Sequence, residues 1–496
     1  MSRFGLGFVA LSGLGLLAPG PVWAQAQPKS KASAAAAKKD AKPKAQPTAP
    51  DVDDKSAPDA NPAMGPSAKF LPSEVFRDDK AKALLDVSRF TELRARPVIA
   101  SDLESFKSMA ADANINLDRN VIDRVVESEA ARLTNHANLQ ALIDPPPGTN
   151  PNSPVLKAIN EATNTLLEPL FVARSIKNQG FLRMYDQILI QRLQPLLKNH
   201  MISRIQAMII LGQSATAQDI PIFLAELKNP TQTIWVKLWA LEGLSNVVDN
   251  GARLSAAAQI DAAKAVAEFL DRGEDLPWPA QYRALQTLAA MRQGFIPSTP
   301  KQAHMASTAM RLLCDADSKP EVRAEAARAL GSMQITSAVP KYNYPLVAHA
   351  IGELAASVGG QVGTTYTHNQ VKARYLTALL AGPIFEAFNG LPGTRDSGLI
   401  HETTGEPAAY SQKVFELVKA IIKASADLLV SPTKLAPERI KDLNARVDAL
   451  KAHLEKNPPA DRRLVQGGPE FPSTLAGQAA LPAAANQPLA GPATRR

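Results

Sequence analysis

The stretch PEVRAEAARALG, residues 320 to 331, decides the fold class. Its small and aliphatic side chains Val322, Ala326 and Leu330 recur every four residues, which is the spacing of one face of an α-helix. A glycine inside a helix costs about 1 kcal/mol relative to alanine. Gly331 therefore requires either a helix end or the close approach of a neighbouring helix.

Three other stretches share this pattern: MISRIQAMIILG, IWVKLWALEGLS and WPAQYRALQTLA, which begin at residues 201, 234 and 278. The seventh residue of every copy is alanine: Ala207, Ala240, Ala284 and Ala326. The twelfth is always small: Gly212, Ser245, Ala289 and Gly331. Another amphipathic segment precedes each copy. Helix pairs recurring about every 40 residues are typical of an α-solenoid, because a single pair cannot bury its apolar face alone.

The fourth copy, with Asp317 just before it, resembles the second helix of a HEAT repeat. The resemblance is strongest there and extends over roughly residues 200–390. It implies an all-α, right-handed α-solenoid of HEAT-like helix pairs. In that family the aspartate and the arginine at the fourth position belong to a ladder of contacts between adjacent repeats. Here those positions are Asp317 and Arg323, with Arg204 at the fourth position of the first copy.

The remaining segments are distinguished by composition and breaks. Residues 118–143 predict one long helix, and residues 369–380 predict a weaker fifth copy with Tyr375 in place of the alanine. The predicted order along the chain is a signal peptide (1–24), a disordered Ala/Lys/Pro-rich linker (25–69), an N-terminal helical region (70–198), HEAT-like repeats (199–390), a loop (391–407), C-terminal capping helices (408–456) and a disordered Pro/Ala-rich tail (457–496).

The N-terminus has the layout of an export signal. Arg3 provides a basic start, and residues 4–17 form an apolar run that ends before a Val-Trp-Ala site at Ala24. The run is shorter than the roughly 20 residues that cross a bilayer. We therefore expect cleavage after Ala24 or after Ala26, and an exported protein in the periplasm or outside the cell, with no integral membrane span once the signal is removed.

The net charge of +8 belongs mostly to the ends of the chain. Residues 25–69 carry eight lysines against five aspartates, and residues 457–496 carry four arginines against two acidic residues. Residues 70–456 are therefore nearly neutral. Because nucleic-acid binding needs a basic surface on the folded part, we expect no nucleic-acid partner.

No sequence motif predicts a catalytic residue, a metal site or a cofactor. Cys314 is the only cysteine and lies in an apolar helical segment, so we expect a buried and unreactive thiol. The pair His401 and Glu402 lacks the second histidine of the HExxH zinc motif. Nucleotide-binding loops, a nucleophile elbow and an EF-hand loop are missing from the sequence.

A helical wheel identifies one candidate binding surface. If Val322, Ala326 and Leu330 face the core, Arg328 points nearly opposite, and the aligned residues of the other copies are Ile209, Glu242, Gln286 and Thr377. Such a row suits an interaction surface and equally an ordinary solvated face. Trp235 and Trp239, one helical turn apart, suit either an aromatic platform or packing between repeats. The candidate partner-binding residues are Trp235, Glu242, Tyr282, Gln286 and Arg328.

These features favour an exported, non-enzymatic scaffold that binds a protein or polymer of the cell envelope through an extended surface. Two alternatives stay open at this point. One is an enzyme, a lyase or hydrolase, built on the same helical scaffold. The other is a structural spacer that adheres to anionic envelope polymers through its lysine-rich linker. The sequence does not indicate the oligomeric state.

Overall fold

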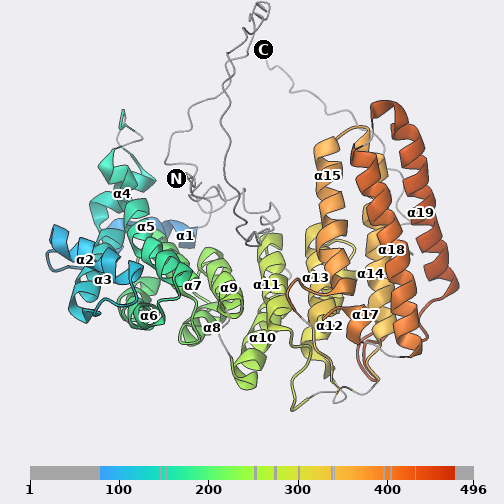
Figure 1. Ribbon diagram of the computed structural model, residues 1–496, viewed down its shortest axis with the longest axis horizontal. Helices are drawn as coiled ribbons and strands as arrows, with labels where there is room; N and C mark the ends of the chain where they lie inside the picture. Colours follow the sequence, from blue (N-terminus) through green and yellow to red (C-terminus); the bar gives the residue numbers. More distant parts are fainter. Residues whose placement is uncertain are drawn as a thin grey trace, which may run out of the picture.

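The computed structural model describes residues 79–145, 148–150, 153–250, 254–272, 276–299, 302–336, 339, 341–394, 397–402, 405–430 and 432–474. Within these ranges the secondary structure is helical and contains no β-strand, as expected for an all-α protein (Figure 1). The predicted signal peptide and linker lie outside the described residues, as does the end of the predicted tail. None of the helices in the described ranges is long and apolar enough to cross a membrane.

The N-terminal region forms a cluster of helices at one end of the molecule: α1 (Asp79–Leu85), α2 (Ala100–Ala111), α3 (Arg119–Thr134), α4 (His136–Ile143), α5 (Pro154–Ser175) and α6 (Gln179–Leu193) (Figure 1). The single helix predicted over 118–143 is wrong. Asn135 adopts an extended conformation between α3 and α4, and its side chain accepts a hydrogen bond from the N–H of Asn138. An asparagine that caps the next helix in this way competes with helix continuation.

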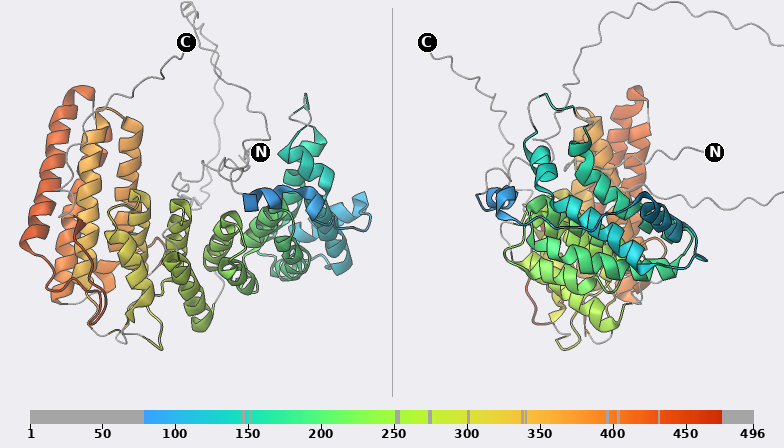
Figure 2. Two further views of the ribbon diagram at one scale, coloured as in Figure 1. Left: turned by 180° about the vertical axis from the view of Figure 1, so that it is seen from behind. Right: turned by 90° about the vertical axis from the view of Figure 1, so that its left-hand side faces the viewer.

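Seven helices follow one another across the middle of the molecule: α7 (Met201–Ser214), α8 (Ile220–Lys228), α9 (Ile234–Asp249), α10 (Ala256–Asp271), α11 (Trp278–Met291), α12 (His304–Cys314) and α13 (Pro320–Ser332) (Figures 1 and 2). Each predicted copy is the second helix of a pair. The second helices pack on one another in order, α7 on α9, α9 on α11 and α11 on α13. Thr233 and Ser255 cap the starts of α9 and α10 through their hydroxyl groups.

The small residues of the pattern lie where successive second helices meet. The four alanines at the seventh position are fully buried. At the twelfth position, a Cβ on Gly212 would lie 3.2 Å from the backbone oxygen of Trp239 in α9. Ser245 in α9 donates a hydrogen bond of 3.2 Å to Thr287 in α11. The expectation of close helix approach at these positions is confirmed.

The C-terminal half contains three long helices that lie side by side, α14 (Tyr344–Tyr366), α18 (Glu406–Val430) and α19 (Ala436–Lys456) (Figures 1 and 2). The shorter helices of this half are α15 (Gln370–Leu379), α16 (Phe385–Asn389) and α17 (Leu399–Glu402). A π-helical turn over Leu380–Ile384, which contains Pro383, joins α15 to α16. The predicted fifth copy is displaced. Gly331 meets Ala387 of α16, which lies beyond the segment 369–380 that the alignment chose. The fifth copy has Tyr375 in place of the seventh-position alanine, so the pattern did not fix its register.

Two predicted segment boundaries are wrong. The loop predicted over 391–407 contains the short helix α17 and the first residues of α18. The tail predicted to be disordered from residue 457 is packed as far as Thr474, with Leu464, Val465 and Phe471 buried. The N–H of Asn343, which caps α14, donates a 2.9 Å bond to the Leu464 carbonyl. Pro/Gly-rich composition concealed the few apolar side chains that anchor this segment.

The predicted aspartate–arginine ladder is also wrong. Arg323 is buried and its Nε donates a 2.9 Å hydrogen bond to the Leu313 carbonyl, at the end of the preceding helix α12. Arg204 similarly donates to the Lys198 carbonyl. Asp317 is exposed, and the hydrogen bond described for it runs from its own backbone N–H to Asp315. Both arginines therefore satisfy carbonyls at a helix end within their own pair. Arg204 also reaches the next pair, where its Nη1 donates a 3.4 Å hydrogen bond to Gln232 between α8 and α9.

Candidate interaction surface

A chain of polar side chains crosses the second helices, and it contains the residues of the predicted row. Glu242 in α9 forms an ion pair with Arg283 in α11. Gln286 in α11 donates a 3.5 Å hydrogen bond to Glu325 in α13. Arg328 then contacts Glu325 within α13, at 3.2 Å, and Glu386 in α16, at 2.9 Å. We call these residues the polar ladder: Glu242, Arg283, Gln286, Glu325, Arg328 and Glu386.

The ladder follows the repeat pattern. The ninth residue of one copy contacts the sixth residue of the next copy in two successive steps, Glu242 to Arg283 and Gln286 to Glu325. The corresponding residues of the first step are Ile209 and Trp239, which are both apolar and half-buried. The polar part of this face therefore begins at α9 and ends at α16.

The helical wheel placed the row opposite the core, but the row does not face open solvent. The side chains of Glu242 and Arg283 are each 24% exposed, that of Arg328 is 27% exposed and that of Glu325 is 3% exposed. Thr377 is buried and bonds to a carbonyl of its own helix. A wheel built on one helix omits the neighbouring second helix, whose flank covers much of this face. The ladder is a recessed polar surface with access to solvent.

The electrostatics of the ladder centre on Glu325. Burial raises the pKa of its carboxyl group, and the nearby charge of Arg328 opposes that shift. Burial lowers the pKa of Arg328, but the carboxylates of Glu325 and Glu386 outweigh it and raise that pKa overall. Burial, followed by the charge of Glu325, raises the pKa of Tyr282. The Oε1 atom of Gln286 is buried and has no hydrogen-bond partner in the described part of the chain.

The predicted aromatic residues are less accessible than a binding platform requires. Trp235 and Trp239 are half-buried and pack against the hydrophobic core. Tyr282 is also half-buried and interacts with Glu325. Tyr282 therefore belongs beside the ladder, whereas the two tryptophans contribute to helix packing.

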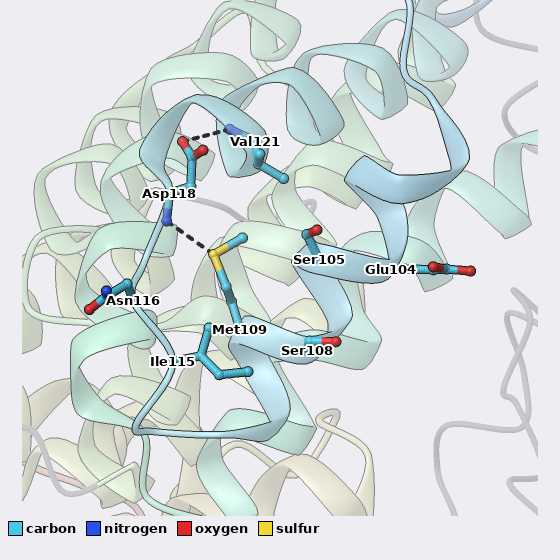
Figure 3. Close-up of a pocket in the computed structure, with 8 residues that line it drawn as sticks. All are labelled: Glu104, Ser105, Ser108, Met109, Ile115, Asn116, Asp118 and Val121. Atoms are coloured by element: carbon cyan, nitrogen blue, oxygen red, sulfur yellow. Dashed lines mark hydrogen bonds between the residues drawn. The ribbon is translucent and has the colours of Figure 1, made fainter.

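An open pocket lies in the N-terminal region, which the sequence did not assign to any role. Glu104, Ser105 and Ser108 of α2 line one side of it (Figure 3). Asn116 lies across the pocket, in the connection that leads to α3. Asp118 caps the start of α3, and its own backbone N–H lies 3.1 Å from the Met109 sulfur. Its lining combines these polar side chains with the apolar side chains of Met109, Ile115 and Val121.

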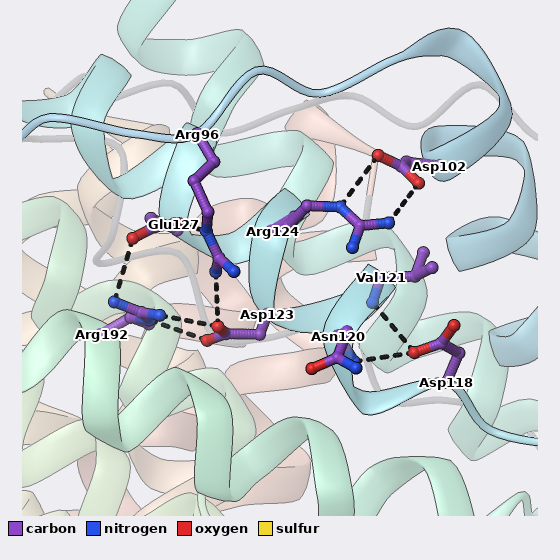
Figure 4. A network of polar contacts seen from close by, with 9 residues as sticks. All are labelled: Arg96, Asp102, Asp118, Asn120, Val121, Asp123, Arg124, Glu127 and Arg192. Atoms are coloured by element: carbon purple, nitrogen blue, oxygen red, sulfur yellow. Dashed lines mark hydrogen bonds and ion pairs between the residues drawn. The ribbon is translucent and has the colours of Figure 1, made fainter.

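A separate arginine–carboxylate cluster joins α3 and α6. Arg96 and Arg192 both contact Asp123 and Glu127, at distances of 2.5 to 3.2 Å (Figure 4). Arg192 is the main cause of the lowered pKa of Asp123, against an opposing effect of burial. The two cations and two anions neutralise each other, so the cluster holds α3 and α6 together and leaves no unpaired charge for a ligand.

Outside the ladder, the histidine and cysteine residues considered in the sequence do not form a metal or catalytic site within the described ranges. No group of three or more histidine, cysteine, aspartate or glutamate side chains within the described ranges is placed to hold a metal ion. His401 lies in the four-residue helix α17, where the sequence suggested a loop. Cys314 is buried as expected, and burial raises the pKa of its thiol to about 12. That thiol is protonated at neutral pH and is a poor nucleophile.

No protein-family model, curated protein or solved structure matches this chain in sequence or fold comparisons.

Three ladder residues were missed by the sequence: Arg283, Glu325 and Glu386. For two of them the sequence does contain a pattern that could have identified them. Arg283 and Glu325 occupy the sixth position of their copies, one residue before the buried alanine, where an apolar helix face carries a charge. A charge at such a position is retained only with a partner, and the partner is the ninth residue of the preceding copy. Glu386 lies after the π-helical turn and outside the alignment.

Proposed function

We propose that this protein is an exported, non-enzymatic α-solenoid of HEAT-like pairs. Its polar ladder would bind a protein or polymer partner of the cell envelope. The observation that carries the proposal is the regular contact between the ninth residue of one copy and the sixth of the next. A right-handed superhelix of such pairs would line one face with second helices and form an extended recognition surface.

The electrostatics of the ladder favour a partner with mixed polar chemistry. Acidic and basic groups alternate along it, from Glu242 through Arg283 to Glu325 and Arg328. The groups are recessed and partly desolvated, so a contact to them is stronger than one to fully solvated charges. Their alternation predicts moderate salt sensitivity, unlike the steep dependence expected for a polyanion.

A charge swap separates binding from folding. The double variant Glu242→Arg with Arg283→Glu keeps an ion pair between α9 and α11 but reverses the pattern that a partner meets. We expect its melting temperature to stay close to that of the original protein, and its capture of envelope partners by immobilised mature protein to be lost.

The matched control is a swap on an exposed pair of α10. Lys264 and Glu268 lie 3.8 Å apart, and both are substantially exposed. Lys264→Glu with Glu268→Lys should change neither melting nor capture. Unchanged capture by the ladder swap, with an intact melt, would exclude the ladder as the binding surface.

A further inference from the structure

Two buried aspartates meet where the N-terminal region joins the row of helix pairs. Asp186 lies on α6, and Asp219 lies at the start of α8. Their residues are 1% and 0% exposed. They lie at the corner that connects α7 to α8, which also contains Ser214 and Thr216. Two like charges repel strongly when they are buried away from solvent, so it would be unfavourable for both carboxyl groups to be ionised.

The hydrogen bonds around the pair leave one atom unexplained. Asp186 accepts from the hydroxyl of Ser214 and, at 2.7 Å, from the hydroxyl of Thr216. The Oδ2 atom of Asp219 accepts a 2.8 Å bond from the Thr216 N–H. The Oδ1 atom of Asp219 is buried and finds no donor among the described residues. The two carboxyl groups share the Thr216 hydroxyl, which lies 2.7 Å from Asp186 and 3.3 Å from Asp219. A proton on Asp219 makes its carboxyl group a donor to the carboxylate of Asp186.

The charges around the aspartate pair balance when the two carboxyl groups hold one proton between them. Arg174 of α5 is the cation whose charge acts on both aspartates. Its guanidinium also donates to the carbonyls of Gln213 and Ser214, which begin the corner. With one shared proton, the aspartate pair carries a single negative charge opposite a single positive charge. A divalent cation in place of the proton would leave an excess positive charge in a buried site.

We propose that Asp186 and Asp219 form a one-proton carboxyl pair that latches the α7–α8 corner to α6 and releases it when the proton leaves. Burial, followed by the charge of Asp186, raises the pKa of Asp219 to about 8. The latch is therefore closed in acid and at neutral pH. It opens as the pH rises through that value, because the second charge must then be hydrated.

The corner is built to transmit this change. Ala215 ends α7 with a φ of 38°, a left-handed conformation that an alanine adopts only when its surroundings hold it. Its carbonyl accepts a 3.3 Å bond from Asn250 at the end of α9. Opening of the corner would therefore loosen α6 on one side and α9 on the other. The latch is independent of the proposed binding function and concerns how the N-terminal region is held on the row.

The test compares the original protein with Asp219→Asn, whose amide can donate to Asp186 but cannot ionise. Hydrogen exchange of residues 213–220 is measured for both proteins at roughly pH 6 and pH 10, on either side of the pKa. Both proteins should protect the corner equally at the lower pH. At the higher pH the original should lose at least tenfold protection relative to the variant. Asp261→Asn, at an exposed position of α10, should behave like the original.

Three results would overturn the proposal. One is equal protection of the original and Asp219→Asn at the higher pH. Another is stabilisation of the original, but not of the variant, by millimolar Ca²⁺ or Mg²⁺, which would make the pair a cation site. If the variant fails to fold, the hydrogen-exchange comparison is replaced by difference infrared spectroscopy of the original protein. A protonated carboxylic acid band that disappears near the pKa supports the latch, and its absence at neutral pH contradicts it.

Discussion

Gly331 and Ala387 lie backbone against backbone, and a Cβ built on Gly331 would fall 2.0 Å from the Ala387 carbonyl oxygen. The carbonyl of Gly331 also accepts a 2.9 Å bond from the N–H of Gly398. Gly331 is therefore a contact point for two later segments of the chain. This explains why a stable helix retains a glycine beside its apolar face: any side chain would separate α13 from α16.

Substitution at Gly331 should be strongly destabilising. Gly331→Ala places a methyl group against rigid backbone, and we expect a loss of about 3 kcal/mol in the free energy of unfolding, measured by urea denaturation. Gly360→Ala is the matched control, because that helical glycine in α14 has open space around its Cβ. The control should gain up to about 1 kcal/mol from helix propensity. Equal effects of the two changes would show that α13 and α16 are not in contact.

Arg328→Ala should reveal how far the ladder is buried. The change leaves the Glu325 carboxylate without its cation in a nearly dry site, so we expect a loss of about 3 kcal/mol. Adding Glu325→Gln should restore part of that loss because it removes the unpaired charge. Arg446→Ala, which breaks an exposed pair with Asp442, should cost no more than about 0.5 kcal/mol. A loss that small for Arg328→Ala would place the ladder in open solvent.

The segment from 457 to 474 should be required for stability. Glu353 in α14 is fully buried and accepts hydrogen bonds from Ser473 and Thr474 in addition to a 3.2 Å contact with His349. Deleting residues 457–496 removes the Ser473 and Thr474 donors, together with several buried apolar side chains. We expect a loss of at least about 3 kcal/mol, measured by urea denaturation.

A shorter deletion provides the control for that segment. Removing residues 475–496 keeps Thr474 and all of the described contacts of Glu353. This protein should unfold at the same urea concentration as the complete chain. If the two deletions behaved alike, the contacts of residues 457–474 would contribute nothing to folding.

His200 should make the protein sensitive to acid. It is fully buried, its Nδ1 accepts from the Ile202 N–H, and its Nε2 contacts the Leu85 carbonyl at 3.0 Å. Burial lowers the pKa of His200 from 6.5 to about 4. The unfolded chain therefore binds this proton more tightly, so the contribution is complete above pH 6.5 and is lost as the pH falls toward 4.

The acid effect can be isolated with His200→Gln. Over this pH range the original should lose about 3 kcal/mol more than the variant. Asp219 acts in the opposite sense across the same range, so only the difference between the two proteins reports on His200. His368→Gln, at an exposed site, should match the original. Parallel pH profiles for the original and His200→Gln would mean that His200 is hydrated.

The export proposal predicts the end of the mature chain. Mass spectrometry of protein from the cell envelope should find Gln25 or Gln27 as the first residue. Ala24→Arg should block cleavage at both sites, because Ala24 is the last residue before the first cut and the third residue before the second, and both positions require a small residue. Full-length protein confined to the cytoplasm would contradict export.

The sequence by itself determined the helices and the repeating contact positions. Helix periodicity is a relation between residues three and four apart, so Val322, Ala326 and Leu330 reveal it without any knowledge of the fold. The alanines at the seventh position are buried as expected because every copy meets the same kind of neighbour. One copy therefore predicts the others except the fifth, where the residue that faces Gly331 is Ala387 in α16, beyond the aligned segment.

The tertiary structure alone decided which polar groups become partners. Arg328 looked solvated on its own helix, but it lies between Glu325 and Glu386, the second of which belongs to an element more than fifty residues later. The proposed proton on Asp219 likewise depends on a distant neighbour, because Asp186 belongs to a different helix, α6. Burial and pKa depend on what surrounds a group in space. Neighbours distant in the chain set both, and no local pattern in the sequence encodes them.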